Sequence, residues 1–223
     1  MRKAFTRRFA AMNPKQMHYE TLAATVIENL AKRRIEGCYC ATVEEAEKQA
    51  FSYLTDGCTV SFGGSMTLEE TGMLTALRHA PGIRLIDRAA ARSPEEVKKF
   101  YHDALSCDYY FMSTNAITAD GELVNIDGTG NRVAALIYGP EHVIILAGMN
   151  KVVPNVTEAL SRVHHTATPM NCKRLSKNTP CAATGVCSDC LSPDCICNQV
   201  VITRRSAIEN RIKVILIGEE LGY

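Results

Sequence analysis

The chain has no long apolar run and no excess of either charge. Its 223 residues contain 25 Lys and Arg against 24 Asp and Glu, so no overall field attracts nucleic acid or an anionic membrane. No apolar stretch approaches the ~20 residues that a transmembrane helix needs. The basic opening segment also lacks the apolar core of a signal peptide. We therefore expect a cytoplasmic protein that binds neither nucleic acid nor membrane and whose thiols stay reduced.

Several catalytic signatures are absent as well. The sequence has no Gly-Lys-Ser/Thr phosphate loop and no Gly-x-Gly-x-x-Gly dinucleotide fingerprint. It also lacks the Gly-x-Ser-x-Gly elbow of hydrolases and the His-Glu-x-x-His motif of zinc peptidases. Because no base–nucleophile pair is visible, a hydrolase or isomerase that relies on carboxylates ranks behind a redox or ligand-binding role.

Helical and strand patterns alternate along the chain. Strand patterns cover residues 58–62, 83–87, 109–113, 123–126, 142–147, 200–203 and 214–217. Helical patterns begin near residues 14, 42, 67, 93, 131 and 154, the first of them closing at Gly37. This alternation predicts an α/β fold with a mostly parallel sheet flanked by helices on both faces. We expect one domain over residues 14–223 after an N-terminal extension, residues 1–13, and a hairpin or edge element from the last two strands.

A glycine turn in "SFGGSMTLEETG" joins the strand at residues 58–62 to the next helix. At such a turn, free backbone N–H groups and the helix dipole favour an anion. Gly63, Gly64, Ser65 and Thr67 are the predicted ligand-binding residues, with a capping box starting at Thr67. Glu69 is a candidate acid/base group, although it would repel a phosphate if it pointed at one. An ordinary capped turn would have the same sequence.

The segment "TNAITADGELVNIDGTGNR" is rich in amides, carboxylates and glycine. Its candidate site residues are Asn115, Asp120, Asn125, Asp127 and Gly128. Asp120-Gly121 is typical of a hairpin turn, whereas Asp127-Gly128 leads into a helix start and would build a polar pocket beside the first turn. Asp127 is the predicted acid/base or ligand-orienting carboxylate. Lys151 follows an apolar strand and is expected to meet an anion at the same edge.

The segment "CAATGVCSDCLSPDCIC", residues 181–197, holds five of the ten cysteines. In a reducing compartment, such crowding indicates a metal site and not a disulfide framework. Thiolates suit iron–sulfur and zinc alike, and the spacing matches neither common ferredoxin run. His164 or His165 could replace one thiol, although a surface loop is the simpler interpretation of this pair, and Cys172 is nearby but isolated in sequence. Residues 172–198 are thus predicted to be a metal-binding loop.

These motifs resemble the LUD-domain family of bacterial proteins tied to lactate utilisation. The resemblance rests on "GGSMTLEETG", "NAITADGELVNIDGTGNRVAALIYGP", "VIILAGMNKVV" and "PCAATGVCSDCLSPDCIC" and runs from about residue 14 to Tyr223. It implies a fold similar to the NagB/RpiA/CoA-transferase group, in which the glycine turn binds phosphate-bearing or acyl-CoA substrates. The glutamate nucleophile of CoA transferases has no counterpart here. Cys195 stands where the resemblance leads us to expect arginine, so it implies the ligand set Cys181, Cys187, Cys190 and Cys197.

Two functions follow as expectations. The first is an iron–sulfur redox accessory or subunit in the oxidation of L-lactate or another 2-hydroxy acid, with an anionic ligand at the glycine-rich sheet edge. Its partners would be other lactate-utilisation subunits or further copies of the chain. The alternative is a non-catalytic metabolite-binding or regulatory protein whose cysteine loop is held by structural zinc.

Overall fold

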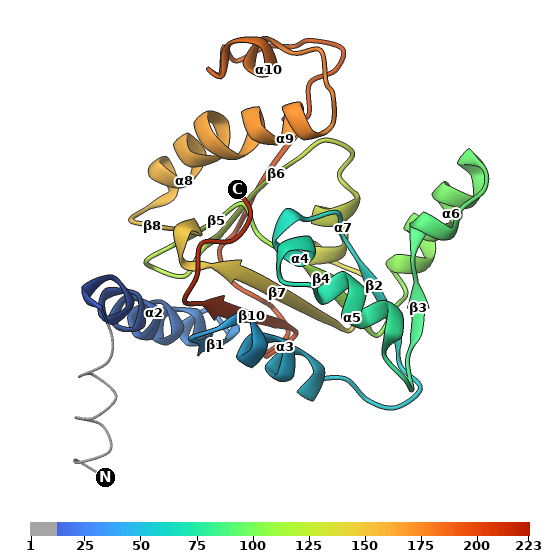
Figure 1. The fold of residues 1–223 in the computed structure, drawn as a ribbon, viewed down its shortest axis with the longest axis vertical. Helices are drawn as coiled ribbons and strands as arrows, with labels where there is room; N and C mark the ends of the chain where they lie inside the picture. The colour runs from blue at the N-terminus through green and yellow to red at the C-terminus, as the bar shows by residue number, and fades with distance from the viewer. Residues whose placement is uncertain (1–12) are drawn as a thin grey trace.

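A six-stranded parallel sheet forms the centre of the molecule. The computed structural model describes residues 13–223, so the predicted extension lies outside the described residues except for Asn13. The strand order is β1–β10–β7–β4–β2–β3, and every neighbouring pair is parallel (Figure 1). These strands are β1 (Glu36–Cys40), β2 (Thr59–Phe62), β3 (Arg84–Ile86), β4 (Tyr109–Met112), β7 (His142–Gly148) and β10 (Ile212–Ile217). The predicted α/β class with a mostly parallel sheet is confirmed.

A second, four-stranded sheet stands at the carboxyl edge of the first. Its order is β8–β5–β6–β9, with β5 and β9 both antiparallel to β6. The strands are β5 (Ala116–Thr118), β6 (Leu123–Asp127), β8 (Val152–Val153) and β9 (Gln199–Thr203). Gly121 has a φ of 84° in the β5–β6 turn, which confirms the predicted turn at Asp120-Gly121.

Helices cover both faces of the large sheet, because the side chains of each strand alternate between the faces. Val143 and Ile145 of β7 pack in one core with the buried residues of α2 and α7. Ile144 and Leu146 pack in the other core with α3, α4 and α5. The helices are α2 (Pro14–Lys32), α3 (Val43–Ser52), α4 (Met66–Glu70), α5 (Met73–His79), α6 (Pro94–Ala104), α7 (Asn131–Ile137), α8 (Val156–Arg162), α9 (Thr168–Arg174) and α10 (Pro180–Thr184).

Local capping explains where most helices begin. Asn13 accepts a hydrogen bond from Gln16 N, and Gln16 Oε1 accepts one from Asn13 N, which completes a capping box at the start of α2.

Short 3-10 turns, η1 (Arg88–Ala90) and η2 (Met149–Lys151), and a π-helical turn, η3 (Val163–Ala167), complete the elements. In the residues that the structure describes, no helix is long and apolar enough to span a membrane.

The structure corrects two predicted helix boundaries and one predicted strand pairing. The first helix ends at Lys32, and Gly37 lies in β1, where a Cβ would approach Leu30 Cδ1 to 3.0 Å. The helix expected from Thr67 begins after Ser65, whose side chain accepts from Leu68 N, and Gly72 divides it into α4 and α5. The last two strands do not form a hairpin: β9 is an edge strand of the small sheet, as the prediction allowed, whereas β10 lies inside the large one.

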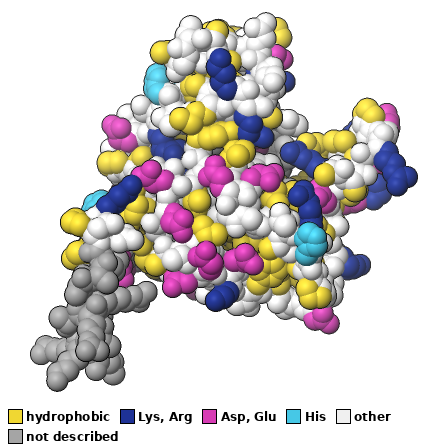
Figure 2. Space-filling view, in the orientation of Figure 1, with side chains coloured by type: hydrophobic (Ala, Val, Ile, Leu, Met, Phe, Trp, Pro, Cys, Tyr) yellow, Lys and Arg dark blue, Asp and Glu magenta, His cyan; other side chains and the backbone are white. Residues whose placement is uncertain are grey.

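The cysteine-rich segment forms a separate lobe above the sheet, together with α9 and α10 (Figure 1). Neither sign of charge dominates the face seen in Figure 2, where Asp and Glu side chains lie near Lys and Arg. This mixture agrees with the formal net charge of +1.

Candidate functional site

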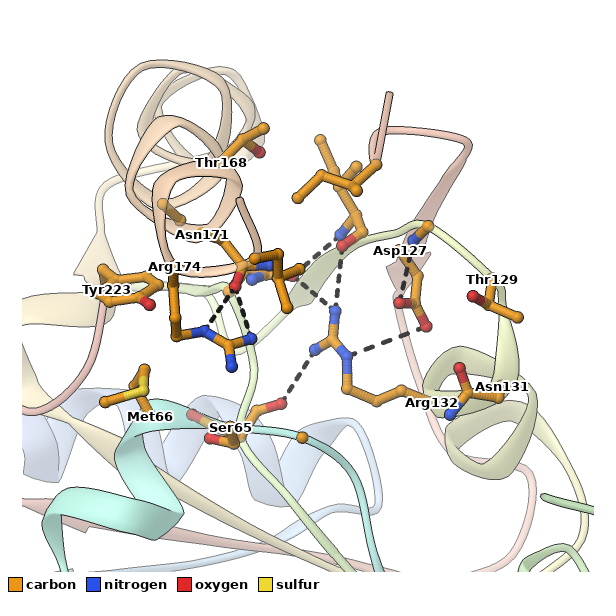
Figure 3. A pocket seen from close by; sticks show the side chains of 18 of the residues that line it. Ser65, Met66, Asp127, Thr129, Asn131, Arg132, Thr168, Asn171, Arg174 and Tyr223 are labelled. Carbon is orange, nitrogen blue, oxygen red and sulfur yellow. Dashed lines mark hydrogen bonds and ion pairs between the residues drawn. The ribbon is translucent and has the colours of Figure 1, made fainter. Parts of the chain in front are cut away.

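A pocket of about 380 Å³ opens between the carboxyl ends of the strands and the cysteine-rich lobe. Its floor comes from the segments that follow β2, β4 and β7, and its wall from the loop between β6 and α7. Helix α9 closes the opposite side (Figure 3). Ligands of open α/β sheets bind at this edge, because loops and helix N-termini converge there.

The charged side chains that line this pocket are mostly cations. They are Arg88, Arg132, Lys151, Arg174 and Lys177, against the single carboxylate of Asp127. The net charge of the chain is close to zero, so this local excess is a property of the site and not of the whole surface. A site of this composition favours an anionic ligand such as a carboxylate or a phosphate.

Arg132 is committed to the architecture of the pocket. Its NH1 donates to Asn125 Oδ1 at 2.6 Å and to Ser113 O at 3.1 Å. Its NH2 donates to Asn115 Oδ1 at 2.8 Å and to Ile126 O at 3.1 Å. Arg132 thereby ties the end of β4 to the end of β6, and its main role is to hold the wall of the pocket in place (Figure 3).

Asp127 is also held by the backbone around it. Its Oδ1 accepts from Gly128 N and its Oδ2 from Val133 N, both at 3.1 Å, and Arg132 Nε lies 4.0 Å from Oδ2. The carboxylate therefore caps the start of α7 while it faces the pocket. This arrangement suits a residue that orients a ligand.

Lys151 lies in the floor and is 2% exposed. Its Nζ donates to Thr67 Oγ1 at 2.7 Å and to Ser113 Oγ at 3.0 Å, and no ion pair with a carboxylate is found among residues 13–223. Burial, together with the nearby Arg162 and Arg132, lowers the pKa of Lys151 to about 7. A substantial fraction of this amine is neutral at physiological pH.

Two arginines at the rim keep donors for a ligand. Arg174 donates through Nε and NH2 to Asn171 Oδ1, at 3.0 and 2.8 Å, and lies beside Tyr223 (Figure 3). An arginine carries five N–H donors, so part of this guanidinium remains for a ligand. Arg88 donates through NH1 to Tyr101 Oη at 2.7 Å. Arginine binds carboxylate and phosphate groups well because its planar donors match their geometry.

The structure brings most of the predicted ligand-binding residues together. Gly64, Ser65, Thr67, Asn115, Asp127, Gly128 and Lys151 all line the pocket. Gly63 and the buried Asn125 lie behind its wall, next to Arg132. Glu69 is exposed on α4 and Asp120 lies in the β5–β6 turn beside Arg33, so neither lines the pocket.

Sequence reasoning predicted Lys151 but missed the other four cations of the pocket and helix α9. Arg132 directly follows the glycine-rich motif and could have been noticed from that position. Arg88, Arg174 and Tyr223 come from segments far apart in the chain, and no local pattern indicates that they meet.

All six cysteines of the C-terminal region line one second cavity, of about 290 Å³. They are Cys172, Cys181, Cys187, Cys190, Cys195 and Cys197. The Sγ atoms of Cys172 and Cys181 are 3.8 Å apart, so Cys172, although isolated in the sequence, joins the other thiols in the fold. Cys187 Sγ lies 3.6 Å from His164 Nδ1, and this histidine belongs to the π-helical turn η3 instead of a loop.

The thiols surround the cavity without forming a compact single-ion site. Among residues 13–223, no three His, Cys, Asp or Glu side chains are close enough to hold one metal ion. Burial raises the pKa of Cys172 and that of Cys197, the latter to about 11. A metal would therefore displace protons from these thiols on binding.

The two cavities share a wall. Thr168, Cys195, Ile196 and Asn198 line both of them. Asn198 Nδ2 donates to Gly128 O at 3.0 Å, and a Cβ on Gly128 would lie 3.4 Å from Ile196 Cα, so the cysteine segment rests on the end of β6. Cys195, which stands where arginine was expected, lies at this junction.

Comparison with solved structures supports the fold. A DUF162 family protein from Deinococcus radiodurans is similar over 89% of this chain and 98% of its own, with 12% identity and a TM-score of 0.53. Weaker similarity links the chain to eIF2B delta from Chaetomium thermophilum, with 20% identity over 54% of this chain and 51% of the other and a TM-score of 0.35. Ribose 5-phosphate isomerase from Plasmodium falciparum has 16% identity over 51% of this chain and 52% of its own, with a TM-score of 0.31.

Sequence comparison gives the family. A search of curated proteins found no match. The LUD domain, in contrast, matches residues 23–217, which include both sheets, every residue of the cation-lined pocket except Tyr223, and all six thiols of the second cavity. The chain belongs to the LUD domain family.

Proposed function

We propose that this protein is an iron–sulfur redox accessory or subunit that binds a small anionic 2-hydroxy acid, with L-lactate as the first candidate. Membership of the LUD domain family supports a role related to lactate utilisation. The observation that carries the proposal is the wall shared by the cation-lined pocket and the cysteine cavity. A redox centre must lie close to the molecule with which it exchanges electrons, whereas a structural zinc site has no such requirement.

One pair of thiols has the spacing that a metal centre requires. Two thiolates bound at ~2.3 Å to one tetrahedral metal are about 3.8 Å apart, and the Sγ atoms of Cys172 and Cys181 are separated by 3.8 Å. We therefore add Cys172 to the proposed ligand set of Cys181, Cys187, Cys190 and Cys197. Iron–sulfur centres bind four thiolates. Cys172 and Cys181 would supply two of them, and the loop after α10 would close around the centre to supply two of the remaining three.

The pocket fits the anion. Arg174 and Arg88 retain donors at its rim, and Lys151 lies in its floor between two hydroxyl groups. A 2-hydroxy acid offers a carboxylate for a guanidinium and a hydroxyl for the polar floor. When bound, an iron–sulfur centre would supply electron transfer, while these side chains would bind and orient the acid.

The test is the iron, acid-labile sulfide and zinc content of the full chain purified without oxygen, with its visible spectrum. We expect iron and sulfide together with a visible absorption band. Cys172→Ser and Cys181→Ser should each lose iron and sulfide. Cys107→Ala is the matched control, because Cys107 is 1% exposed, as is Cys172, but lies in the core away from the cavity.

Stoichiometric zinc in colourless protein would contradict the redox function and favour a structural metal beside a metabolite-binding pocket. Iron retained in Cys172→Ser would leave the redox function standing but remove Cys172 from the ligand set.

A further inference from the structure

We propose that Lys151 is a carbonyl-binding nucleophile, whose side-chain amine forms an imine with a 2-oxo acid in the cation-lined pocket. This inference rests on the proposed function in one respect, namely that the pocket takes small carboxylic acids. It goes further by assigning covalent chemistry to one residue and by naming the oxidised acid as a ligand.

The amine of Lys151 acts as a donor in its hydrogen bonds to the two neighbouring hydroxyl groups. Two of its N–H groups donate to Thr67 Oγ1 and Ser113 Oγ. Thr67 in turn donates to Leu221 O at 3.3 Å, and Ser113 donates to Thr114 O at 3.4 Å. Each hydroxyl has a single proton, so neither can also donate to Nζ. In the neutral amine, the lone pair therefore has no donor from these two neighbours and is free to attack a carbonyl carbon.

The electrostatic surroundings of Lys151 favour its neutral amine. An amine is a nucleophile only in its neutral form, and burial near other cations favours that form. Lys151 is 2% exposed, and Arg162 and Arg132 are the nearest charged influences besides Glu70, which acts in the opposite direction. Its pKa of about 7 provides neutral amine at the pH of the cell.

The charges around the amine suit a 2-oxo acid. A Cβ on Gly222 would lie 3.3 Å from Nζ and would collide with Thr67, so a carbonyl group would reach the amine from the pocket and not from the side of Gly222. Arg174 and Arg88 at the rim can hold the carboxylate of the 2-oxo acid while its carbonyl group points to the floor. A lysine that served only as an anion anchor would gain nothing from a lowered pKa.

The reaction is balanced without an oxidant. The Nζ lone pair forms a bond to the carbonyl carbon, and the carbonyl oxygen leaves as water together with the two protons of the amine. The product is a C=N imine, and no electrons are transferred. A hydride donor added by the experimenter reduces this imine to a stable secondary amine.

The experiment uses pyruvate as the probe. The full chain, purified without oxygen, is incubated with pyruvate and sodium cyanoborohydride, and the product is measured by intact mass and peptide mapping. We expect a single adduct that maps to Lys151. Because this adduct is mapped on the parent protein, the result does not depend on whether a variant folds. Lys151→Arg should give no adduct, whereas Lys98→Arg, at an exposed lysine of α6, should label like the parent protein.

The pH dependence provides a second readout. The rate of adduct formation should rise with pH through a midpoint near 7, because the neutral fraction follows the pKa of Lys151. Labelling that continues to rise towards pH 10, is spread over several lysines or persists in Lys151→Arg would overturn the proposal. So would the absence of any adduct.

The outcomes also separate this proposal from the redox function. Pyruvate that raises the melting temperature but leaves no adduct would refute the imine while preserving the anion pocket. An adduct on protein without iron would refute the redox function and leave the imine standing.

Discussion

Replacing Lys151 by methionine should reverse the sign of its effect on stability between pH 7 and pH 10. The lysine is buried, and its pKa of about 7 lies well below its ordinary value of 10.5. Each pKa unit of difference between the folded and the unfolded state corresponds to ~1.36 kcal/mol of stability. In the unfolded chain the amine is protonated up to about pH 10, whereas in the folded protein it is half neutral at pH 7. The unfolded state therefore binds more protons, and the contribution of this group to stability rises with pH.

The magnitude follows from these values. At pH 7 the buried amine destabilises the folded state by about 4 kcal/mol relative to a lysine with its ordinary pKa, and at pH 10 by about 1 kcal/mol. Methionine has a similar unbranched stem but forfeits two hydrogen bonds of about 1 kcal/mol each. Thr67 and Ser113 keep their own acceptors, so neither hydroxyl is left without a partner. Lys151→Met is thus expected to be about 2 kcal/mol more stable at pH 7 and about 1 kcal/mol less stable at pH 10.

The assay is reversible urea unfolding of both proteins at the two pH values, in the presence of a reductant. Other titrating groups, including the thiols, cancel when the two proteins are compared at the same pH. Lys98→Met controls for the loss of a positive charge at an exposed position. A difference between Lys151→Met and the parent that does not change from pH 7 to pH 10 would refute the lowered pKa and, with it, the electrostatic argument for the imine.

Four further substitutions test the fold and are measured as changes in melting temperature or in urea unfolding. Gly57→Ala should lower the stability by ~1–2 kcal/mol, because the backbone there is left-handed. No clash adds to this cost, since nothing lies within 4 Å of the added Cβ. Gly121→Ala should cost more, because its Cβ would also lie 2.9 Å from Leu30 N, and equal costs would contradict the clash. Asn13→Ala should lose ~1 kcal/mol from the cap of α2, and no loss would mean that water replaces this cap. Arg211→Lys should destabilise by ~2 kcal/mol, because lysine cannot reproduce the three bonds to backbone carbonyls at the end of α7, and an unchanged melting temperature would contradict that role.

The sequence predicts the layers of the fold well, because periodicity and capping are local properties. The capping signals at Asn13 and at Ser93 lie where α2 and α6 begin. Ser65 and Thr67 show where such reasoning fails, since both residues can cap a helix. The structure uses Ser65, because Lys151 and Leu221, which are remote in the sequence, engage the Thr67 hydroxyl.

Topology and the site depend on contacts that no local pattern encodes. Strands β9 and β10 are similar short apolar segments, yet β10 is buried along its whole length and β9 is partly exposed at the edge of the small sheet. The meeting of Cys172 with Cys181 requires α9 to pack against α10. Arg174 reaches the pocket from the same helix, α9. The cysteine run and the glycine turns could be recognised in the sequence, but the wall shared by the two cavities could not.

The most direct test of the central claim is the electron paramagnetic resonance spectrum of the reduced protein, prepared without oxygen, before and after addition of L-lactate or pyruvate. If a redox centre lies against the anion pocket, the spectrum should show an iron–sulfur signal that changes when the acid binds. The change should be weakened in Arg174→Gln, which loses a rim cation but no thiol. An unchanged iron–sulfur signal, under conditions where a thermal shift shows the acid to be bound, would contradict the claim that the two cavities form one functional site, and the absence of any iron signal would contradict the redox function itself.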